Sequence, residues 1–349
     1  MPNLVVGNQP TIHFQRAGAG ETIVLIHGLG ANLAFWFMSV GRVLARDYHI
    51  VCYDLRGHGG SDMPRHDYLL PHMVDDLNGL LDHLEIDKAH IVGHSFGARV
   101  ALAHAIMAPQ RQASLTIADT QAKCLQGPMR LREWPHWARW KRELVDMGHN
   151  GLPDDEEIIT FELLKHFNDL SSGFAHGTLA SGSAAQSADD AQLPAPMKKK
   201  RAARRAAVAG ARAAGNGAPS LRRRDMGRKG AARWNELMEQ TSAKAEFADE
   251  QPLTREAIAG IRVPTLAMYG ELSHCIPSCR QLEKLIPRTH VALVPGAGHF
   301  HPAVKPRRFV KLLDHFLREH PGASAAQALP AGRKRAAAIA ARARQPGLR

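Results

Sequence analysis

Residues 91–100 carry the pattern in this chain that points most clearly to chemistry. A short apolar run leads into Gly93-His94-Ser95-Phe96-Gly97, and an alanine-rich stretch of helical character follows. The G-x-S-x-G spacing between a strand and a helix puts a serine hydroxyl on a sharp turn, with glycines where a Cβ would collide with backbone. Amide groups at the start of the following helix attract negative charge that develops there. The pattern predicts Ser95 as a nucleophile.

Apolar runs alternate with helical patterns on both sides of this turn. After a hairpin at 4–6 and 11–16, the expected strands are 22–26, 49–53, 89–93, 114–118, 263–270 and 290–294, and the expected helices are 71–84, a segment from the Ser95 turn to about 107, 278–286 and 306–319. This alternation predicts an α/β protein with a mostly parallel, doubly wound sheet, whose carboxyl edge collects the functional groups. His27, Ser95 and Asp119 each stand at the end of an expected strand.

Residues 120–255 interrupt the alternation. Residues 130–170 look helical and amphipathic and contain Trp134, Trp137 and Trp140, whereas 171–233 are rich in Ser, Gly, Ala and Arg. A further helix is expected at 234–248. We therefore expect a core that contains the sheet at 1–120 and 259–320, and a helical cap at 121–258 inserted after the sixth strand. A disordered basic insertion is expected at about 181–233 within the cap, and a disordered basic tail at 321–349.

The formal net charge of +12 is concentrated in two segments. Residues 198–233 hold 13 Lys and Arg against one acid, and the tail 321–349 holds six Lys and Arg and no acid, which leaves −6 for the rest of the chain. Basic segments can attach a protein to nucleic acid or to an anionic membrane. Because both segments have few large apolar groups, we interpret them as solvated and disordered, and expect no specific nucleic-acid partner.

The rest of the composition is that of a globular protein. The chain has 349 residues, of which 44% are hydrophobic, enough for a substantial core. No apolar run approaches about 18 residues, and no basic stretch before an apolar run opens the chain, so we expect neither a membrane span nor a signal peptide. Cys275 and Cys279, without a second pair, are a poor zinc signature. With only four cysteines, the chain is expected in the cytoplasm, and its oligomeric state stays open.

Four motifs give the chain a resemblance to the α/β-hydrolase superfamily over roughly residues 4–120 and 260–320. They are His27-Gly28-Leu29-Gly30, Asp54-Leu55-Arg56-Gly57-His58-Gly59, Gly93-His94-Ser95-Phe96-Gly97 and Pro295-Gly296-Ala297-Gly298-His299. The resemblance implies an α/β-hydrolase fold, and it leaves the substrate open because this fold hosts many activities. It also implies that the Asp54–Gly59 run is structural and holds a loop near the site.

A serine hydroxyl needs a base that takes its proton and an acid that orients the base. The resemblance implies that His299, in a glycine-rich loop after the last strand, is this base, since the order Ser, acid, His is that of α/β-hydrolases. An oxyanion also needs two backbone donors. The amide of Phe96, directly after the nucleophile, is one, and the amide of Leu29 in the His27–Gly30 loop is the other expected donor.

The acid departs from the usual family pattern. Family members place it after the next-to-last strand in Gly-x-x-Asp-x-x-x-Pro, where this chain reads Gly270 to Pro277 with Ser273 in the acid slot. A serine cannot carry the negative charge that stabilises an imidazolium. Asp119, at the end of the strand expected at 114–118, is the preferred acid. Some dehalogenases and lipases of this fold take their acid from the end of the corresponding strand. Glu271 is the second choice, and a site with neither acid stays open.

A serine nucleophile indicates acyl chemistry, since haloalkane dehalogenases and epoxide hydrolases of this fold use Asp at that place. We expect a serine hydrolase that cleaves a small carboxylic ester, thioester or lactone through an acyl-enzyme, without metal or cofactor. A C–C bond hydrolase, an acyltransferase, and a catalytically impaired binding module favoured by Ser273 are the alternatives. Trp134, Trp137 and Trp140 would suggest an apolar acyl group, although such side chains more often form the core of a cap.

Overall fold

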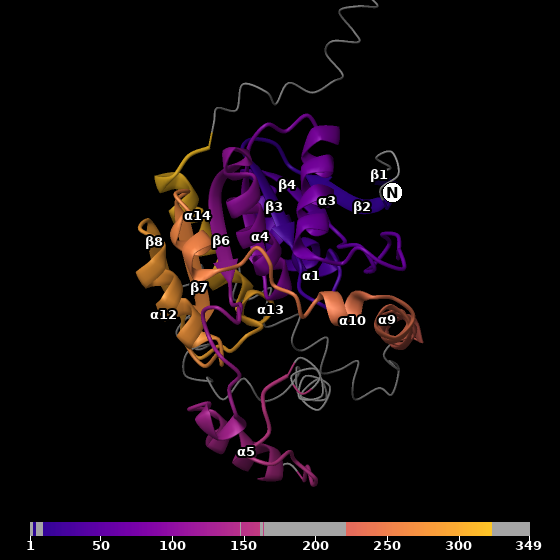
Figure 1. The fold of residues 1–349 in the computed structure, drawn as a ribbon, viewed down its shortest axis with the longest axis vertical. Helices are drawn as coiled ribbons and strands as arrows, with labels where there is room; N and C mark the ends of the chain where they lie inside the picture. The colour runs from indigo at the N-terminus through magenta and orange to yellow at the C-terminus, as the bar shows by residue number, and fades with distance from the viewer. Residues whose placement is uncertain (1–2, 5–9, 147, 161–162, 164–220, 323–349) are drawn as a thin grey trace, which may run out of the picture. The chain divides into compact units, whose positions relative to one another are not determined.

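The computed structural model describes residues 3–4, 10–146, 148–160, 163 and 221–322. Within these residues the chain forms an eight-stranded sheet in the order β1-β2-β4-β3-β5-β6-β7-β8 (Figure 1). The strands are β1 (Asn3–Leu4), β2 (Ile12–Ala17), β3 (Thr22–Ile26), β4 (His49–Tyr53), β5 (Ala89–His94), β6 (Gln112–Ala118), β7 (Thr265–Gly270) and β8 (Thr289–Val294). Strand β2 pairs antiparallel with β1 and β4, and all other pairs are parallel. The predicted α/β fold with a mostly parallel sheet is confirmed.

Helices pack on both faces of the sheet. The helices of the sheet unit are α1 (Ala34–Trp36), α2 (Arg42–Leu44), α3 (Leu70–His83), α4 (Phe96–Met107), α10 (Ala243–Glu246), α11 (Arg255–Ala259), α12 (Ile276–Leu285), α13 (His301–Val304) and α14 (Pro306–Glu319), with a π-helical turn at Phe37–Gly41 between α1 and α2. Helix α4 packs on β5 and β6 and contacts α3 and α11, and α12 packs on β7. Helix α14 contacts β8, α2 and the π-helical turn.

The alternation of side chains along each strand explains this two-sided cover. Ile23 and Leu25 of β3 belong to a buried cluster with Trp36 and Phe309, which come from α1 and α14. The neighbouring residues of β3 point to the other face, and the whole strand after Thr22 is buried. Strands buried on both faces read as continuous apolar runs, which is why the sequence located them well.

The chain divides into two compact units, residues 1–126 with 236–349, and residues 127–235. The second unit enters between β6 and β7, the place expected for the cap. Its helices are α5 (Trp137–Asp146) and the first part of α9 (Leu221–Gln240). Trp137 is 2% exposed and packs with Leu131 and Leu144, and the Trp134 and Trp140 rings lie 5.5 Å apart. These tryptophans form a core of the second unit itself, as residues of this kind usually do.

Two expectations for the insertion differ from the structure. Of the stretch 130–170 that looks helical in sequence, residues 130–160 contain a 3₁₀ turn at Leu131–Glu133 and helix α5, which ends at Asp146. Gly148 and Gly151 follow at φ of 87° and 75°, conformations that glycine adopts without strain. Helix α9 begins at Leu221, whereas the disordered insertion was expected to run to 233. Alanine, arginine and lysine in this stretch have favourable helix propensities, which composition alone did not weigh. The rest of that insertion, 181–220, and the tail after 322 lie outside the described residues.

Among the described residues, no helix is both long enough and apolar enough to cross a membrane.

Candidate active site

The turn at Ser95 has the strained geometry that the G-x-S-x-G pattern predicts. Ser95 joins β5 to α4 with φ of 56° and ψ of −120°, a conformation that residues with a side chain rarely adopt. A Cβ on Gly93 would lie 2.2 Å from the Gly97 carbonyl oxygen, and a Cβ on Gly97 would lie 2.4 Å from the Ile26 carbonyl oxygen. Only glycine fits either place, so the flanking glycines allow β5, the turn and α4 to pack this closely.

The loop after β3 approaches the same turn. A Cβ on Gly28 would lie 2.9 Å from the Ser95 Cβ and 3.4 Å from its Oγ, so this glycine lets the loop lie directly against the hydroxyl. The amides of Leu29 and Phe96 donate no hydrogen bond to another described residue. Phe96 is the first residue of α4, where amide groups have no partner within the helix. Both expected oxyanion donors are therefore available to a bound group.

Two buried histidines fix the shape of that loop. The His27 Nδ1–H donates to the Gly28 carbonyl at 2.8 Å, and its Nε2 accepts from the Leu55 amide at 3.1 Å. The Gly30 amide donates to His58 Nε2 at 3.2 Å. Burial lowers the pKa of His27, so its ring is neutral and acts as a brace between the two loops.

The Asp54–Gly59 run is structural, as the resemblance implies. Asp54 is buried and accepts hydrogen bonds from the Leu33 amide at 2.6 Å, the Gly60 amide at 2.8 Å and the His13 ring at 2.7 Å. Arg56 forms a two-pronged ion pair with the buried Asp76, with both N···O distances at 2.7 Å. The run thereby ties the loop after β4 to the loop after β3 and to α3.

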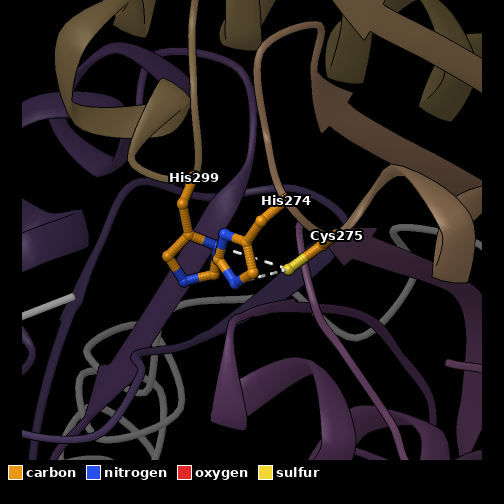
Figure 2. Close-up of side chains that lie close together, drawn as sticks. All are labelled: His274, Cys275 and His299. Atoms are coloured by element: carbon orange, nitrogen blue, oxygen red, sulfur yellow. Dashed lines mark hydrogen bonds between the residues drawn. The ribbon is translucent and has the colours of Figure 1, made fainter. Parts of the chain in front are cut away.

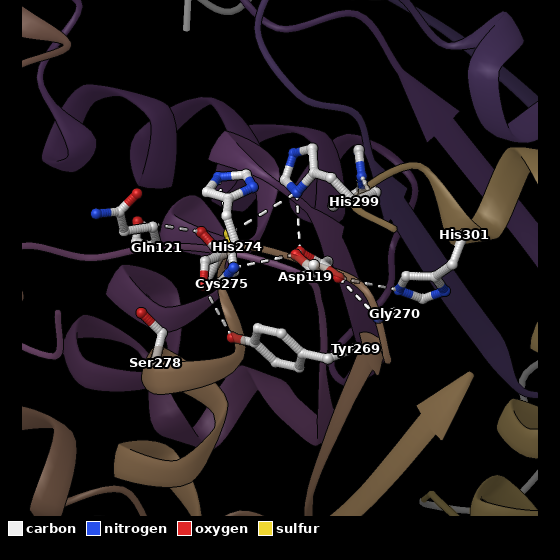
Figure 3. Close-up of polar contacts among 12 residues, drawn as sticks. Asp119, Gln121, Tyr269, Gly270, His274, Cys275, Ser278, His299 and His301 are labelled. Atoms are coloured by element: carbon white, nitrogen blue, oxygen red, sulfur yellow. Dashed lines mark hydrogen bonds and ion pairs between the residues drawn. The ribbon is translucent and has the colours of Figure 1, made fainter. Parts of the chain in front are cut away.

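Asp119 lies against His299. The His299 Nδ1 and the Asp119 Oδ1 are 2.8 Å apart, although the residues are 180 positions apart in sequence. Asp119 directly follows β6 with φ of 57° and is fully buried. Its Oδ2 accepts from the Gly270 amide at 2.8 Å, and its Oδ1 accepts from the Ser273 hydroxyl at 2.6 Å (Figure 3). Ser273, at the position where the family usually has the acid, thus donates a hydrogen bond to the Asp119 carboxylate.

The surroundings of Asp119 keep it ionised. Burial by itself would raise the pKa of Asp119, but the hydrogen bond and charge of His299, the nearby His301 ring and the Ser273 hydrogen bond together bring that pKa well below its usual range. Asp119 is therefore a carboxylate at neutral pH. A carboxylate on Nδ1 fixes the imidazole tautomer that leaves Nε2 free to accept a proton.

Glu271, the second candidate acid, lies elsewhere. Its side chain is exposed and its Oε2 accepts from the Gly296 amide at 2.9 Å. This contact links the turn after β7 to the loop after β8, which leads to His299. Of the two carboxylates that the sequence left open, the structure brings Asp119, and not Glu271, to the His299 ring.

His94, which the sequence did not single out, supports the His299 loop. Its Nε2 donates to the His299 carbonyl at 2.9 Å, and its ring stacks on Phe35 with centroids 4.7 Å apart. Burial lowers the pKa of His94 well below the ordinary value, so the ring stays neutral. The only sequence signal for His94 was its position directly before Ser95, at the carboxyl end of a strand. A histidine with a purely structural role can occupy the same position, so this signal did not identify its contact.

The Ser95 hydroxyl makes no hydrogen bond to His299 within the part of the chain that the structure describes. Catalytic hydrogen bonds are often long before substrate binds and tighten afterwards, so this gap does not remove His299 from consideration. Two further side chains missed by the sequence lie beside the His299 ring (Figure 2). The Cys275 Sγ is 3.9 Å from the His299 Nδ1, and the centroid of the His274 ring is 5.4 Å from that of His299. The arrangement can thus offer a nucleophile, a base with a carboxylate behind it, and two amide donors at one edge of the sheet.

Comparison with known proteins places the chain in a family. The model of the alpha/beta hydrolase fold family matches residues 21–306. The chain is similar to 3-oxoadipate enol-lactonase 2 of Acinetobacter baylyi, with 31% identity over 166 residues that make up 44% of this chain and 59% of the relative. It is also similar to a fluoroacetate dehalogenase of a Burkholderia species, with 35% identity over 114 residues, or 31% of this chain and 37% of the relative. The chain thus spans less than two thirds of either curated relative.

Among solved structures, the enol-lactonase of Burkholderia xenovorans LB400 has a similar fold. The match has a TM-score of 0.54 and 19% sequence identity, and it covers 91% of this chain and all of the other. At this identity the likeness concerns the fold alone. The family match covers most of the chain, and the sheet order is that of the fold. Gly93 and Gly97 stand where the turn at Ser95 leaves no room for a Cβ. The chain belongs to the alpha/beta hydrolase fold family.

Proposed function

We propose that this chain is a serine hydrolase that cleaves a small carboxylic ester or lactone through an acyl-enzyme. The observation that carries the proposal is the buried Asp119 carboxylate 2.8 Å from His299, beside a strained turn that presents Ser95. A binding module on a hydrolase scaffold was favoured by the serine in the usual acid slot. Ser273 no longer favours such a module, because the Asp119 carboxylate contacts His299 in place of the usual acid.

The proposed reaction begins with attack of the Ser95 Oγ on the acyl carbon. The His299 Nε2 takes the hydroxyl proton and then gives it to the leaving alcohol, while Asp119 stabilises the imidazolium in between. The Leu29 and Phe96 amides would donate to the oxyanion of the tetrahedral intermediate. Water, activated by the same imidazole, then releases the acid and restores the serine.

The named relatives support hydrolysis but differ in the bond they break. One is an enol-lactonase and another a dehalogenase. Similarity over part of the chain does not identify the substrate. The serine at position 95 favours acyl substrates, since displacement of a halide in this fold uses a carboxylate nucleophile. A lactone and a linear ester differ only in whether the leaving alcohol stays attached, so both fit the proposed chemistry.

Purified protein is expected to hydrolyse p-nitrophenyl esters of short acids, and five- and six-membered lactones, at rates well above the uncatalysed rate. A series of acyl chain lengths and a parallel lactone series, each followed by kcat/KM, identify the preferred class. Chloroacetate and fluoroacetate serve as controls that should release no halide. Halide release without ester or lactone turnover would contradict the proposal.

Ser273→Ala is expected to lower kcat about 10-fold, equivalent to roughly 1.4 kcal/mol, with KM nearly unchanged. The reason is that the Ser273 hydroxyl donates to Asp119 at 2.6 Å and accepts from the Cys275 amide at 3.1 Å, so it orients the carboxylate. Ser273→Thr keeps the hydroxyl and should recover most of kcat. Equal kcat for Ser273→Ala and the wild type would show that Asp119 holds its position without this bond.

A further inference from the structure

Three potential metal ligands meet beside the His299 ring. The His299 ring is itself one of the three, and the other two are His274 and Cys275. Each residue offers one ligand atom, and these atoms all lie within 4.8 Å of one another. The Cys275 Sγ lies 3.3 Å from the His274 Nε2 and 3.9 Å from the His299 Nδ1 (Figure 2). The sequence did not predict a metal site, because it paired Cys275 only with Cys279. The actual neighbours are an adjacent histidine and one that lies 24 positions further along the chain.

These spacings are close to those of a tetrahedral metal site. With metal–sulfur and metal–nitrogen bonds of about 2.3 Å and 2.0–2.1 Å, the ligand atoms of a tetrahedral site lie about 3.3–3.6 Å apart. The two sulfur–nitrogen distances of 3.3 and 3.9 Å bracket that range. The third spacing, between the His274 and His299 nitrogens, is within 4.8 Å, so the three side chains must move toward one another to hold an ion.

The chemistry of the ligands suits a thiophilic divalent cation. Imidazole nitrogens and a thiolate sulfur are among the ligands that Zn²⁺ binds in proteins, and His274, Cys275 and His299 supply two of the first kind and one of the second. A cysteine binds a metal as the thiolate, so binding at Cys275 releases one proton. The Asp119 carboxylate, 2.8 Å from the His299 Nδ1, adds an oxygen and a negative charge at the same place. A mixed sulfur, nitrogen and oxygen set favours zinc or cadmium over magnesium or calcium.

We propose that His274, Cys275 and His299 form an inhibitory site for Zn²⁺ or Cd²⁺, in which the metal takes the His299 Nδ1 away from Asp119. On binding, the Cys275 thiol loses its proton to solvent and the His299 Nδ1 proton moves to Nε2. The imidazole then has no free electron pair on the side that faces the nucleophile. The loss of activity therefore rests on the proposed function, whereas the binding of the metal does not.

Binding can be measured without any substrate, by titrating untagged protein with Cd²⁺ and following the ultraviolet sulfur-to-cadmium charge-transfer absorption. A Cys124→Ser background removes the one partly exposed thiol of the described residues. The wild-type site should give one cadmium per chain. Cys275→Ser should abolish the band, and should weaken binding at least about 100-fold, since loss of even an outer-shell partner of a metal site costs 10–100-fold.

Cys279→Ser is the matched control. Cys279 lies one helical turn along α12, its amide donates to the Cys275 carbonyl at 3.2 Å, and its thiol is equally buried. This variant should keep the cadmium band and its stoichiometry. Absence of the band in the wild type, or its persistence in Cys275→Ser, would overturn the site. Cys275→Ala, checked by circular dichroism, distinguishes loss of the ligand from loss of the fold.

The inhibition is tested separately with the best ester or lactone found above. Zn²⁺ at about 100 times its measured dissociation constant should reduce the rate of the wild type at least about 10-fold, EDTA should restore it, and Cys275→Ala should be resistant. Binding without inhibition would mean that the metal does not hold His299 and would overturn the inhibitory role. A protein without any hydrolytic activity would instead contradict the proposed function, while the cadmium titration would still report on the site.

Discussion

Replacing Ser95 by alanine is expected to lower kcat for the best ester or lactone by about 10⁴–10⁶-fold, because the change removes the hydroxyl that is proposed to attack the acyl carbon. Substrate binding should change little, since the change removes one oxygen atom. The expectation follows from the turn itself, whose φ of 56° is a strained conformation for a residue with a side chain and holds Ser95 between β5 and α4. Initial rates under saturating substrate measure the effect.

Stability provides the control for this variant. Alanine can occupy the same strained conformation at a similar cost, so the midpoint of thermal unfolding should stay within a few degrees of the wild type. Retention of more than about a tenth of kcat in a correctly folded Ser95→Ala protein would mean that a different group is the nucleophile.

Asp119→Asn is expected to lower kcat by a factor on the order of 10²–10⁴. The amide of asparagine cannot stabilise the imidazolium, and it can turn its NH₂ group toward the His299 Nδ1, which then adopts the wrong tautomer. Because Asp119 accepts from the Gly270 amide and the Ser273 hydroxyl, asparagine also loses part of these two contacts. KM should change much less than kcat, since Asp119 is fully buried behind the base.

Glu271→Gln is the matched control, because it makes the same chemical change at the other candidate acid. Glu271 is exposed and bonds the Gly296 amide, which a glutamine oxygen can still accept. Its kcat should therefore remain within about threefold of the wild type, as expected for a neutral replacement of an exposed hydrogen bond. A larger loss in Glu271→Gln than in Asp119→Asn would move the role of the acid to Glu271.

The double change Asp119→Asn with Ser273→Asp tests whether the base can be served from the usual family position. The Ser273 Oγ lies 2.6 Å from the Asp119 oxygen that contacts His299, so a side chain one atom longer reaches the same region. Partial recovery of kcat relative to Asp119→Asn alone is expected. No recovery in a folded double variant would show that only β6 can present a carboxylate to His299.

The sequence predicted the sheet well because its strands are continuous apolar runs ending in recognisable turns. The strand expected at 49–53 and the helix expected at 306–319 have those bounds in the structure. The choice of Asp119 as the preferred acid also came from the sequence, since Ser273 occupied the usual slot and left the end of β6 as the alternative. The two carboxylates could not be separated further, because their distances from His299 depend on the path of two loops.

Contacts between residues far apart in the sequence could not be predicted, because these residues belong to no recognisable motif. Ser273 reaches Asp119 across 154 positions, and His94 reaches the His299 carbonyl across 205. A buried serine or histidine carries no periodicity that would reveal its partner. The cluster of His274, Cys275 and His299 was missed because an adjacent His–Cys pair with one histidine 24 positions later matches none of the common metal-ligand spacings.

The most direct test of the central claim is to react the protein with a fluorophosphonate and locate the adduct by mass spectrometry of the digested chain. We expect one adduct per chain on the peptide that contains Ser95, no adduct in Ser95→Ala, and slower labelling in Asp119→Asn because His299 is then less basic. An adduct on any other serine, or equal labelling of Ser95→Ala and the wild type, would contradict it.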